Sequence, residues 1–536
     1  MKKLKKIMVV LILLILLIMF LTTKKVFANN SANLFEPVEY SDDFKKWLEL
    51  SDEEKKNVII PRMYDVPFSK PEYTNPFYRA KMLRSNISPK YDLRDIIPAN
   101  LAIRNQMQTN SCWAFASLSS LETNLALSNY KKGTNLSKIY DFSERHMEYS
   151  TNRYFKDNVE NPKGFNREVG SGGTYLMAET YLANGYGAIP EAEMPFENNE
   201  KLIDISQIQN KTVSSQLYDF AMYPDYNTEA TEVKDIIVNQ IKQHIQNYGS
   251  VYAGLHGANI YGDCFNFVTG ALFCGNSSEH PANHAVSIVG WDDNYSVDNF
   301  NENGKPTSNG AWIVRNSWGK RIEKMTIQQF REVLFAETRE ECIQNGWNSP
   351  DDLSDEFINY ASKVYNYSIE NDIVYQNYGD NGFIYVSYED VNISKNLCGV
   401  VKATDTVNYD NNYYYDELGF CSALNIASPS IMLCNLFDKK TTNSEYLTHV
   451  SLSVPSACIC KVYVNPNGTS KSKSDLQLVP LKSGETGMLT SAGYHSLEFS
   501  KPVEITANSF AVVVEIQSLL TLTPIYVEAK NTIRHW

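Results

Sequence analysis

Positive charge is scarce in this chain of 536 residues. Lysine and arginine number 49 against 62 aspartates and glutamates, which leaves a formal net charge of −13 at pH 7. A phosphate backbone is bound by a basic face, so this balance argues against nucleic acid as a partner. Heptads, a solenoid period and a sortase-type tail are also missing from the sequence. The length predicts two or three globular units rather than one core.

Apolar runs long enough to span a bilayer are lacking too. The longest run, "IMVVLILLILLIMFL", has about 15 residues where a span needs ~20. "MKKLKK" precedes it, and "VFA" follows with a small residue at Ala28. This pattern predicts that residues 1–28 are a cleaved signal peptide of a secreted, extracellular or cell-wall-associated protein. An uncleaved membrane anchor is the alternative.

The cysteine count excludes complete pairing within the chain, because nine is odd. Cys264 and Cys274 bracket one loop and could form a disulfide. Cys458 and Cys460 lie two apart in a strand-like run, which places their side chains on one face. Buried or unpaired thiols are the alternative for these cysteines, and the sequence leaves the choice open.

Three changes of pattern divide the chain. Residues 29–84 are acidic at first and then rich in Pro and Tyr, and a basic cluster follows at 79–85, which is typical of a pro-segment with a processing site. Residues 85–394 have helical periodicity early, over 111–127, and strand-like runs late. We therefore predict an α+β unit with a helical lobe and a β-barrel-like lobe.

Within this unit, residues 320–379 form an insertion with two amphipathic stretches. A lid, a docking surface or simple packing are the alternatives for it. Each stretch is predicted to form a helix with one apolar face. The apolar face of the first contains Ile327, Phe330 and Leu334. The second begins after a Ser349 cap, and its apolar face contains Leu353, Phe357, Tyr360 and Val364.

Residues 395–536 consist of short β-rich runs separated by turn signals, the rhythm of a sandwich or jelly roll. The Asp/Asn-rich stretch "TDTVNYDNN" could hold Ca²⁺, but it lacks the regular spacing of a calcium loop, so a solvated loop is favoured. We predict no other metal and no cofactor.

Cys112 is the first candidate for chemistry. It follows Ser111 at the start of the helical stretch, where the helix dipole would favour the thiolate form. By itself this position is more typical of a structural cysteine.

Four other side chains complete a constellation for acyl transfer. Gln106 lies six residues upstream, where its amide can donate to an oxyanion beside the Cys112 N–H. His284 opens the run "HAVSIVGW" and can act as base and acid. Asn316, in "RNSWG", can orient His284, and Trp318 can shield that hydrogen bond from water.

The stretches "NQMQTNSCWAFA", "NHAVSIVGWDD" and "WIVRNSWG" resemble the papain family of cysteine peptidases. The resemblance covers roughly 88–319 and 380–390. It implies a nucleophile at Cys112, a general base and acid at His284, an orienting residue at Asn316 and an oxyanion donor at Gln106. It further implies that Gly172 and Gly173 border the substrate groove, where a backbone without Cβ pairs with an extended peptide.

Two departures from the family pattern stand out. Thr109 and Asn110 replace the Cys-Gly of the usual signature, and Gly170 stands where the partner cysteine of that disulfide would be. The spacings from Cys112 to His284 and Asn316, 172 and 204 residues, exceed the expected ~130–150. Insertions account for the excess, so the groove's shape is affected more than the catalytic set.

The C-terminal part resembles the lectin-like domain fused to such peptidases in secreted clostridial proteins, which implies a cell-wall polymer or glycan as an added partner. The leading hypothesis is a secreted cysteine endopeptidase made as a zymogen, with protein or peptide substrates. A cell-wall peptidase or transpeptidase, and a binding protein with a vestigial peptidase unit, are the alternatives.

Overall fold

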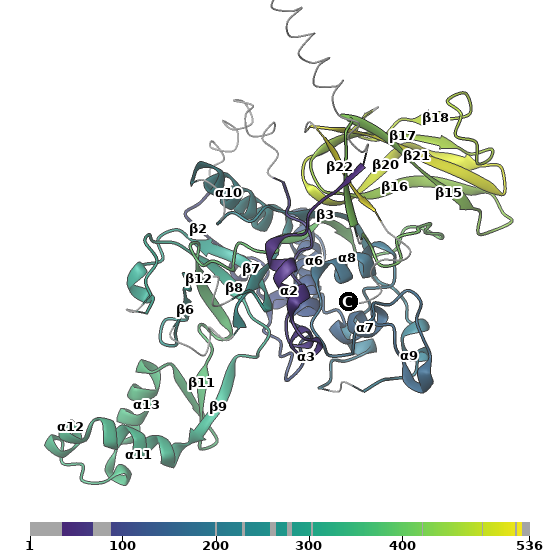
Figure 1. Cartoon of the computed structure of the whole chain (residues 1–536). Coiled ribbons are helices and arrows are strands. Elements are labelled where there is room, and N and C mark those ends of the chain that lie inside the picture. Colours follow the sequence, from purple (N-terminus) through teal and green to yellow (C-terminus); the bar gives the residue numbers. More distant parts are fainter. Residues whose placement is uncertain are drawn as a thin grey trace, which may run out of the picture.

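The structure is a computed structural model that describes residues 35–67, 87–198, 201–227, 231–257, 264–275, 281–301, 304–420, 422–484, 486–519 and 522–527. Two lobes form the centre of the molecule, a smaller unit projects from one lobe, and β-sheets of the C-terminal part lie beyond the other (Figure 1). The predicted signal peptide and the basic cluster at 79–85 lie outside the described residues.

The helical lobe is built around one long buried helix. Leu118, Leu121 and Leu125, the predicted stripe, are at most 4% exposed. Gly133 adopts φ +65° and ends the helix in a left-handed cap, as glycine commonly does. The helices of this lobe are α6 (Cys112–Lys132), α7 (Glu144–Ser150), α8 (Tyr175–Ala183) and α9 (Ser206–Gln209), and α10 (Thr231–Tyr248) packs against α6 and the main sheet.

An 11-stranded sheet forms the second lobe and continues beyond it. The strands follow the order β16-β20-β3-β13-β4-β7-β8-β12-β6-β5, with β2 paired to β7. Their bounds are β2 Lys90–Asp92, β3 Gln216–Met222, β4 Val251–Leu255, β5 Phe265–Asn266, β6 Ala271–Leu272, β7 His284–Asp292, β8 Ala311–Arg315, β12 Phe383–Ser387, β13 Cys398–Thr404, β16 Glu445–Val454 and β20 Ala492–Ile505. Short 3₁₀ turns occupy Leu93–Asp95, Pro98–Leu101, Lys156–Asn158, Glu191–Glu193, Val297–Asn299 and Pro350–Asp352.

The C-terminal part is β-rich, as predicted. A second sheet has the order β15-β21-β17-β18, with β19 also paired to β17, and it packs on β16 and β20 through a separate apolar core. These strands are β15 Ser430–Asp438, β17 Cys458–Asn465, β18 Gln477–Val479, β19 Gly487–Leu489 and β21 Ser509–Ser518.

The boundary between the two parts differs from the prediction at residue 395. Strand β13 follows that residue, yet it pairs with β3 and β4 in the main sheet, so the structure places the boundary after Thr404. Strand β20 also pairs with β3, and His495 stands opposite Asp219. Backbone hydrogen bonds therefore join the C-terminal part to the second lobe in one sheet.

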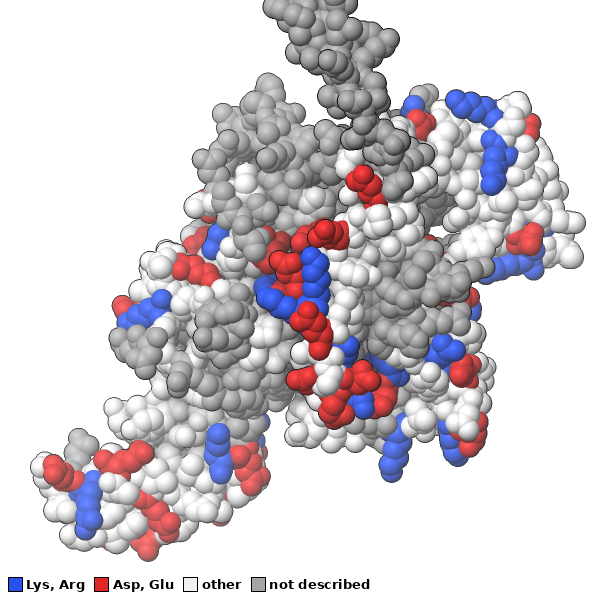
Figure 2. Space-filling view, viewed as in Figure 1, with Lys and Arg blue, Asp and Glu red and all other residues white. Residues whose placement is uncertain are grey.

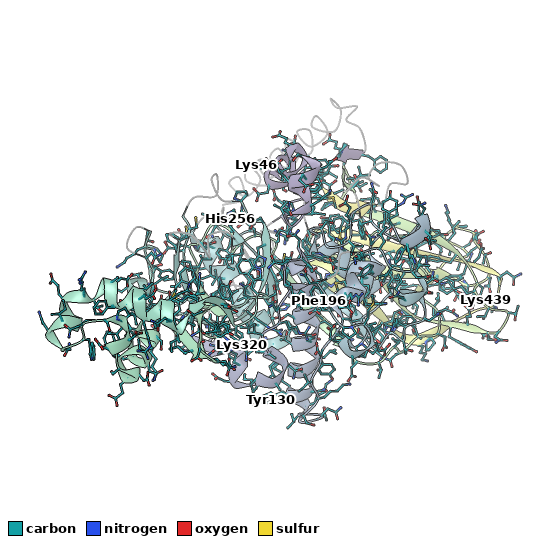
Figure 3. The ribbon with its side chains drawn as sticks, turned by 90° about the horizontal axis from the view of Figure 1, so that it is seen from below. Lys46, Tyr130, Phe196, His256, Lys320 and Lys439 are labelled. Atoms are coloured by element: carbon teal, nitrogen blue, oxygen red, sulfur yellow. The ribbon has the colours of Figure 1, made fainter. Side chains whose placement is uncertain are left out.

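The insertion is a small unit with its own core. Three strands, β9 (Arg321–Thr326), β10 (Tyr367–Glu370) and β11 (Ile373–Asn377), carry the helices α11 (Ile327–Glu337), α12 (Arg339–Gln344) and α13 (Asp355–Val364). It projects away from the lobes in Figure 1, and Figure 3 shows Lys320 near its root. It holds eleven acidic and six basic residues, and acidic side chains are prominent on it in Figure 2.

The second predicted helix of the insertion was partly wrong. Helix α13 begins after Ser354, whose side chain accepts from the Phe357 N–H, and not after Ser349. Tyr360 and Val364 are 66% and 43% exposed, because Ile358 and Ala361 carry the buried face instead.

Residues 35–67 cross both lobes. Helices α2 (Asp42–Glu49) and α3 (Asp52–Lys56) lie over the junction of the lobes (Figure 1). Strand β1 (Phe35–Pro37) pairs with β14 (Ser422–Ile426), which also pairs with β22 (Thr523–Val527). The described part of the predicted pro-segment is thus ordered against both the lobes and the C-terminal strands.

The cysteine pairs considered above and the apolar character of the helices can be compared with the structure. Cys274 is a free buried thiol, so the disulfide considered for it is not formed. The sulfurs of Cys458 and Cys460 lie 3.7 Å apart on one face of β17, as predicted. None of the helices within the described ranges has the length and apolar character to cross a membrane.

Candidate active site

Cys112 is the first residue of α6 and lies where the helical lobe meets the start of β7. The space between Gly172 and Gly173 on one side and Asn283 on the other is called the cleft below. The residue is 4% exposed, and its sulfur is in reach of the backbone N–H of Ala285, the residue after His284. The helix start and the start of β7 therefore meet at this thiol. That juxtaposition follows from the packing of α6 against β7.

His284, Asn316 and Trp318 come together on the sheet side of the cleft. The ring Nε2 of His284 lies 2.8 Å from Oδ1 of Asn316, a distance at which a protonated Nε2 donates a hydrogen bond. Trp318 packs over the His284 ring at 4.5 Å between ring centroids. Asn316 is 3% exposed, so this hydrogen bond is shielded from water.

Gln106 is buried beside the same strand end. Its Nε2 donates to the Thr109 carbonyl at 2.7 Å, and its Oε1 accepts from the Ser317 hydroxyl at 2.6 Å. Since an amide nitrogen carries two hydrogens, one N–H of Gln106 remains for a further acceptor. The main-chain carbonyl of residue 109 thus helps to orient this side chain.

Gly172 and Gly173 border the cleft on the helical side, and residues 56–60 already lie against them. Gly173 O accepts from Ile60 N at 2.9 Å, and Gly172 N donates to Lys56 O at 2.7 Å. A Cβ on Gly172 would lie 1.8 Å from the Val58 carbonyl oxygen, so only glycine permits this approach.

The opposite wall of the cleft is also engaged by this segment. Ile59 N donates to the carbonyl of Asn283 at 3.3 Å, directly before His284. Ile59 and Ile60 are 1% and 4% exposed. Residues 56–60 therefore contact both walls of the cleft.

Burial controls the ionisation of the thiol and the imidazole in this form. Burial raises the pKa of Cys112 to about 12, although backbone N–H groups oppose the shift. Burial lowers the pKa of His284 to about 4, against the effect of its hydrogen bond to Asn316. Both groups are neutral near pH 7, which is the less nucleophilic state of the thiol.

A buried ionic network behind the site was missed from the sequence. Arg104, two residues before Gln106, donates to Glu122 of α6 at 2.7 Å, and Arg315 lies 3.9 Å from the same carboxylate. Burial raises the pKa of Glu122 to about 7, and the two arginines oppose the shift. Arg315 beside Asn316, and a glutamate on the apolar helix face, were the signals available.

The described residues contain no group of three or more His, Cys, Asp or Glu side chains placed to hold a metal ion. Asp405, from the stretch considered for Ca²⁺, forms an ion pair with Lys138 and accepts from the Tyr140 hydroxyl. The calcium site stays a prediction.

Two family models match the chain. The one described as papain family cysteine protease matches residues 87–333, and the one described as lectin like domain matches residues 412–534.

Curated relatives are similar to the first of these regions. Cathepsin Q of Rattus norvegicus is 24% identical over 307 residues, which cover 56% of this chain and 76% of that protein. Serine-repeat antigen protein 5 of Plasmodium falciparum is 30% identical over 223 residues, which cover 41% of this chain and 21% of that protein. The chain thus spans about a fifth of the latter.

Solved structures of similar fold cover both regions. The cysteine protease and lectin-like domains of Cwp84, a surface layer associated protein of Clostridium difficile, align with a TM-score of 0.64 at 22% identity, over 94% of this chain and 89% of that one. The C116A form of Cwp84 after propeptide cleavage aligns with a TM-score of 0.59 at 22% identity, over 83% and 88%. The likeness shows a shared fold.

Proposed function

We propose that this chain is a secreted cysteine endopeptidase made as a zymogen. The proposal is supported by the match of residues 87–333 to the papain family cysteine protease model and of residues 412–534 to the lectin like domain model. The observation that carries the peptidase proposal is the His284–Asn316 hydrogen bond under Trp318, opposite a thiol at a helix start. This arrangement suits a nucleophile, a base and an orienting group.

The proposed reaction divides the work among four side chains. His284 takes the proton of the Cys112 thiol, and the resulting thiolate attacks the peptide carbonyl. The backbone N–H of Cys112 and the remaining N–H of Gln106 hold the oxyanion. His284 then protonates the leaving amine, and water hydrolyses the thioester while Asn316 keeps the imidazole oriented.

The zymogen proposal is supported by the position of residues 56–60. They take the hydrogen bonds that a substrate strand would use at Gly172 and Gly173, and Ile59 also bonds to Asn283, the residue before His284. Removal of this segment would rehydrate the cleft, lower the pKa of Cys112, raise that of His284 and favour the ion pair.

The direct test is Cys112→Ala against a matched cysteine control, Cys434→Ala in the lectin-like domain. We expect the first to lose casein hydrolysis and labelling by an E-64-type epoxysuccinate, and the second to keep both. Retained turnover in Cys112→Ala would refute the assignment.

Maturation and location are tested together by sequencing the N-terminus of secreted protein. The wild type should begin after residue 67, and Cys112→Ala should retain the pro-segment if processing is autocatalytic. Protein or peptide substrates are expected, and the lectin-like domain is expected to attach the enzyme to a cell-wall polymer or glycan. Parallel assays on casein and isolated cell wall distinguish an endopeptidase from a cell-wall peptidase.

A further inference from the structure

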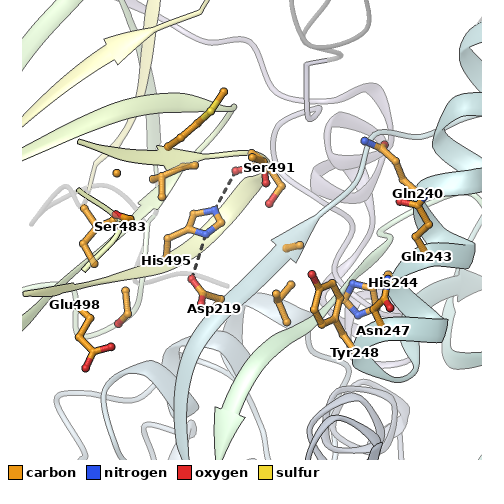
Figure 4. A pocket seen from close by; sticks show the side chains of 18 of the residues that line it. Asp219, Gln240, Gln243, His244, Asn247, Tyr248, Ser483, Ser491, His495 and Glu498 are labelled. Carbon is orange, nitrogen blue, oxygen red and sulfur yellow. Dashed lines mark hydrogen bonds and ion pairs between the residues drawn. The ribbon is translucent and has the colours of Figure 1, made fainter. Parts of the chain in front are cut away.

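A cavity of about 460 Å³ lies at the junction of the peptidase and the lectin-like domain, away from the cleft that holds Cys112. One wall is the exposed face of α10, with Gln243, Asn247 and Tyr248. The other wall is the turn before β20 and that strand itself, with Thr490 and Ser491 (Figure 4). The volume falls in the range of ~300–1,000 Å³ that is usual for small-molecule sites.

The cavity is held open by the sheet that joins the two domains. Strand β20 is hydrogen-bonded to β3, so the floor of the cavity spans the junction without a hinge. His495 of β20 lies 3.4 Å from the Asp219 carboxylate of β3 through Nδ1, and its Nε2 lies 3.0 Å from the Ser491 carbonyl oxygen (Figure 4). A ligand would therefore meet a preformed site.

The charged groups of the cavity are compensated by one another. Asp219 faces His495, and Glu498 forms an ion pair with Lys482, which helps to lower the pKa of that carboxyl. No cluster of cations is present among the described residues that line the cavity, so an anionic ligand has little to bind there.

The remaining polar groups are amides and hydroxyls, each of which can donate and accept. Gln243 and Asn247 supply amides from one wall, while Thr490 and Ser491 supply hydroxyls from the other. This lining matches a neutral ligand that presents many hydroxyl groups.

Tyr248 adds the aromatic surface that such a ligand requires. Its side chain ends α10 at the rim of the cavity, is 39% exposed and packs against His244 at 5.4 Å between ring centroids. Met488, 60% exposed, borders the cavity from the lectin-like domain. The C–H face of a pyranose ring packs on surfaces of this kind while its hydroxyls reach the amides.

We propose that this junction cavity is a composite binding site for an uncharged saccharide, built by α10 of the peptidase together with β20 and its preceding turn in the lectin-like domain. The inference rests on the proposed glycan attachment and assigns the glycan-binding site to the junction cavity. It also means that the peptidase supplies half of the site.

The test measures binding of neutral trisaccharides (cellotriose, chitotriose and mannotriose) to the full chain by calorimetry, in the Cys112→Ala background to prevent autolysis. Asn247→Trp places a large ring into the cavity from an exposed helix position, and Gln246→Trp is the matched control on the same helix outside the lining. Tyr248→Ala removes the rim surface.

We expect saturable binding of at least one trisaccharide, unchanged in Gln246→Trp and weakened at least about tenfold in Asn247→Trp and Tyr248→Ala. Equal binding by Asn247→Trp and Gln246→Trp would overturn this site but leave glycan attachment elsewhere intact. Failure of all three sugars to bind would refute both glycan proposals, and casein hydrolysis by the Cys112 enzyme would be unaffected. Binding of a Gly-Ser-Asn tripeptide in place of the sugars would assign the cavity to peptides and refute the saccharide.

Discussion

Arg62 anchors residues 35–67, the segment proposed to be inhibitory, and its replacement by alanine should strongly weaken the proposed autoinhibition. Its guanidinium donates to the carbonyl of Tyr223 at 2.7 Å, to the carbonyl of Leu397 at 2.9 Å and to the Tyr175 hydroxyl at 3.3 Å. The residue is 8% exposed, so water does not compete for these contacts.

The size of the effect follows from these three hydrogen bonds. A hydrogen bond from a charged group contributes about 1.5–3 kcal/mol, but the released guanidinium recovers solvation in water, so the net loss is less than the sum. We expect about 3 kcal/mol, which corresponds to roughly 150-fold weaker binding of the segment.

The assay uses a peptide of residues 35–67 as an inhibitor of the processed enzyme, with turnover of a short peptide substrate as the readout. The inhibition constant of the Arg62→Ala peptide should rise about 150-fold. Lys45→Ala is the matched control, because its ion pairs with Glu39 and Asp42 are solvent-exposed and worth little. An Arg62→Ala peptide that inhibits as well as the control would refute the reasoning.

Three further predictions follow from burial and from strand pairing. Burial raises the pKa of Glu179 from 4.5 to about 7. The folded protein therefore holds this proton more tightly than the unfolded chain does, and the protonated side chain adds to the free energy of unfolding below pH 4.5. That contribution is lost as the pH rises to 7. Glu179→Gln should therefore raise the free energy of unfolding at pH 8 by about 3 kcal/mol but change it little at pH 4, as measured by urea denaturation of Cys112→Ala protein. The rate of Cys112 alkylation, measured by mass spectrometry, should rise about tenfold per pH unit between pH 8 and 10 in the unprocessed chain, because the pKa of the buried thiol is about 12. The processed enzyme should show no such rise. Arg321 and Asn377 are paired across β9 and β11, so two glycines can bridge the chain when residues 322–376 are removed. This deletion should leave the hydrolysis of short peptides within about threefold of the wild type. Loss of soluble protein would contradict the independence of the insertion.

The members of the candidate catalytic constellation could be located because each of them is marked by local sequence. Cys112 follows a helix-starting serine, His284 opens an apolar strand, and Asn316 and Trp318 lie within one short motif. Their meeting was inferred from the resemblance to a family, and the structure brings His284, Asn316 and Trp318 into contact. Distances between local motifs depend on the whole fold, so spacing alone could not supply them.

The errors arose where a segment's partner lies far away in the chain. Strand β13 has no sequence feature that separates it from the β-runs after it, yet it pairs with β3 about 180 residues earlier. In the insertion, Ser349 and Ser354 both precede acidic residues, and burial of Ile358 rather than Tyr360 decided which one begins the helix. Tertiary packing selects among local signals of similar strength.

The contacts of residues 35–67 imply that processing affects more than the cleft. Strand β1 covers the free edge of β14, Arg62 bonds to carbonyls at the ends of two segments of the main sheet, and residues 56–60 fill the cleft. Removing the segment therefore uncovers backbone N–H and C=O groups of β14 at the same time as it opens the site around Cys112. An uncovered strand edge is available for pairing with another chain. Because both surfaces are covered by one continuous segment, the edge of β14 and the cleft should become accessible together, and β14 amides should lose hydrogen-exchange protection only after processing.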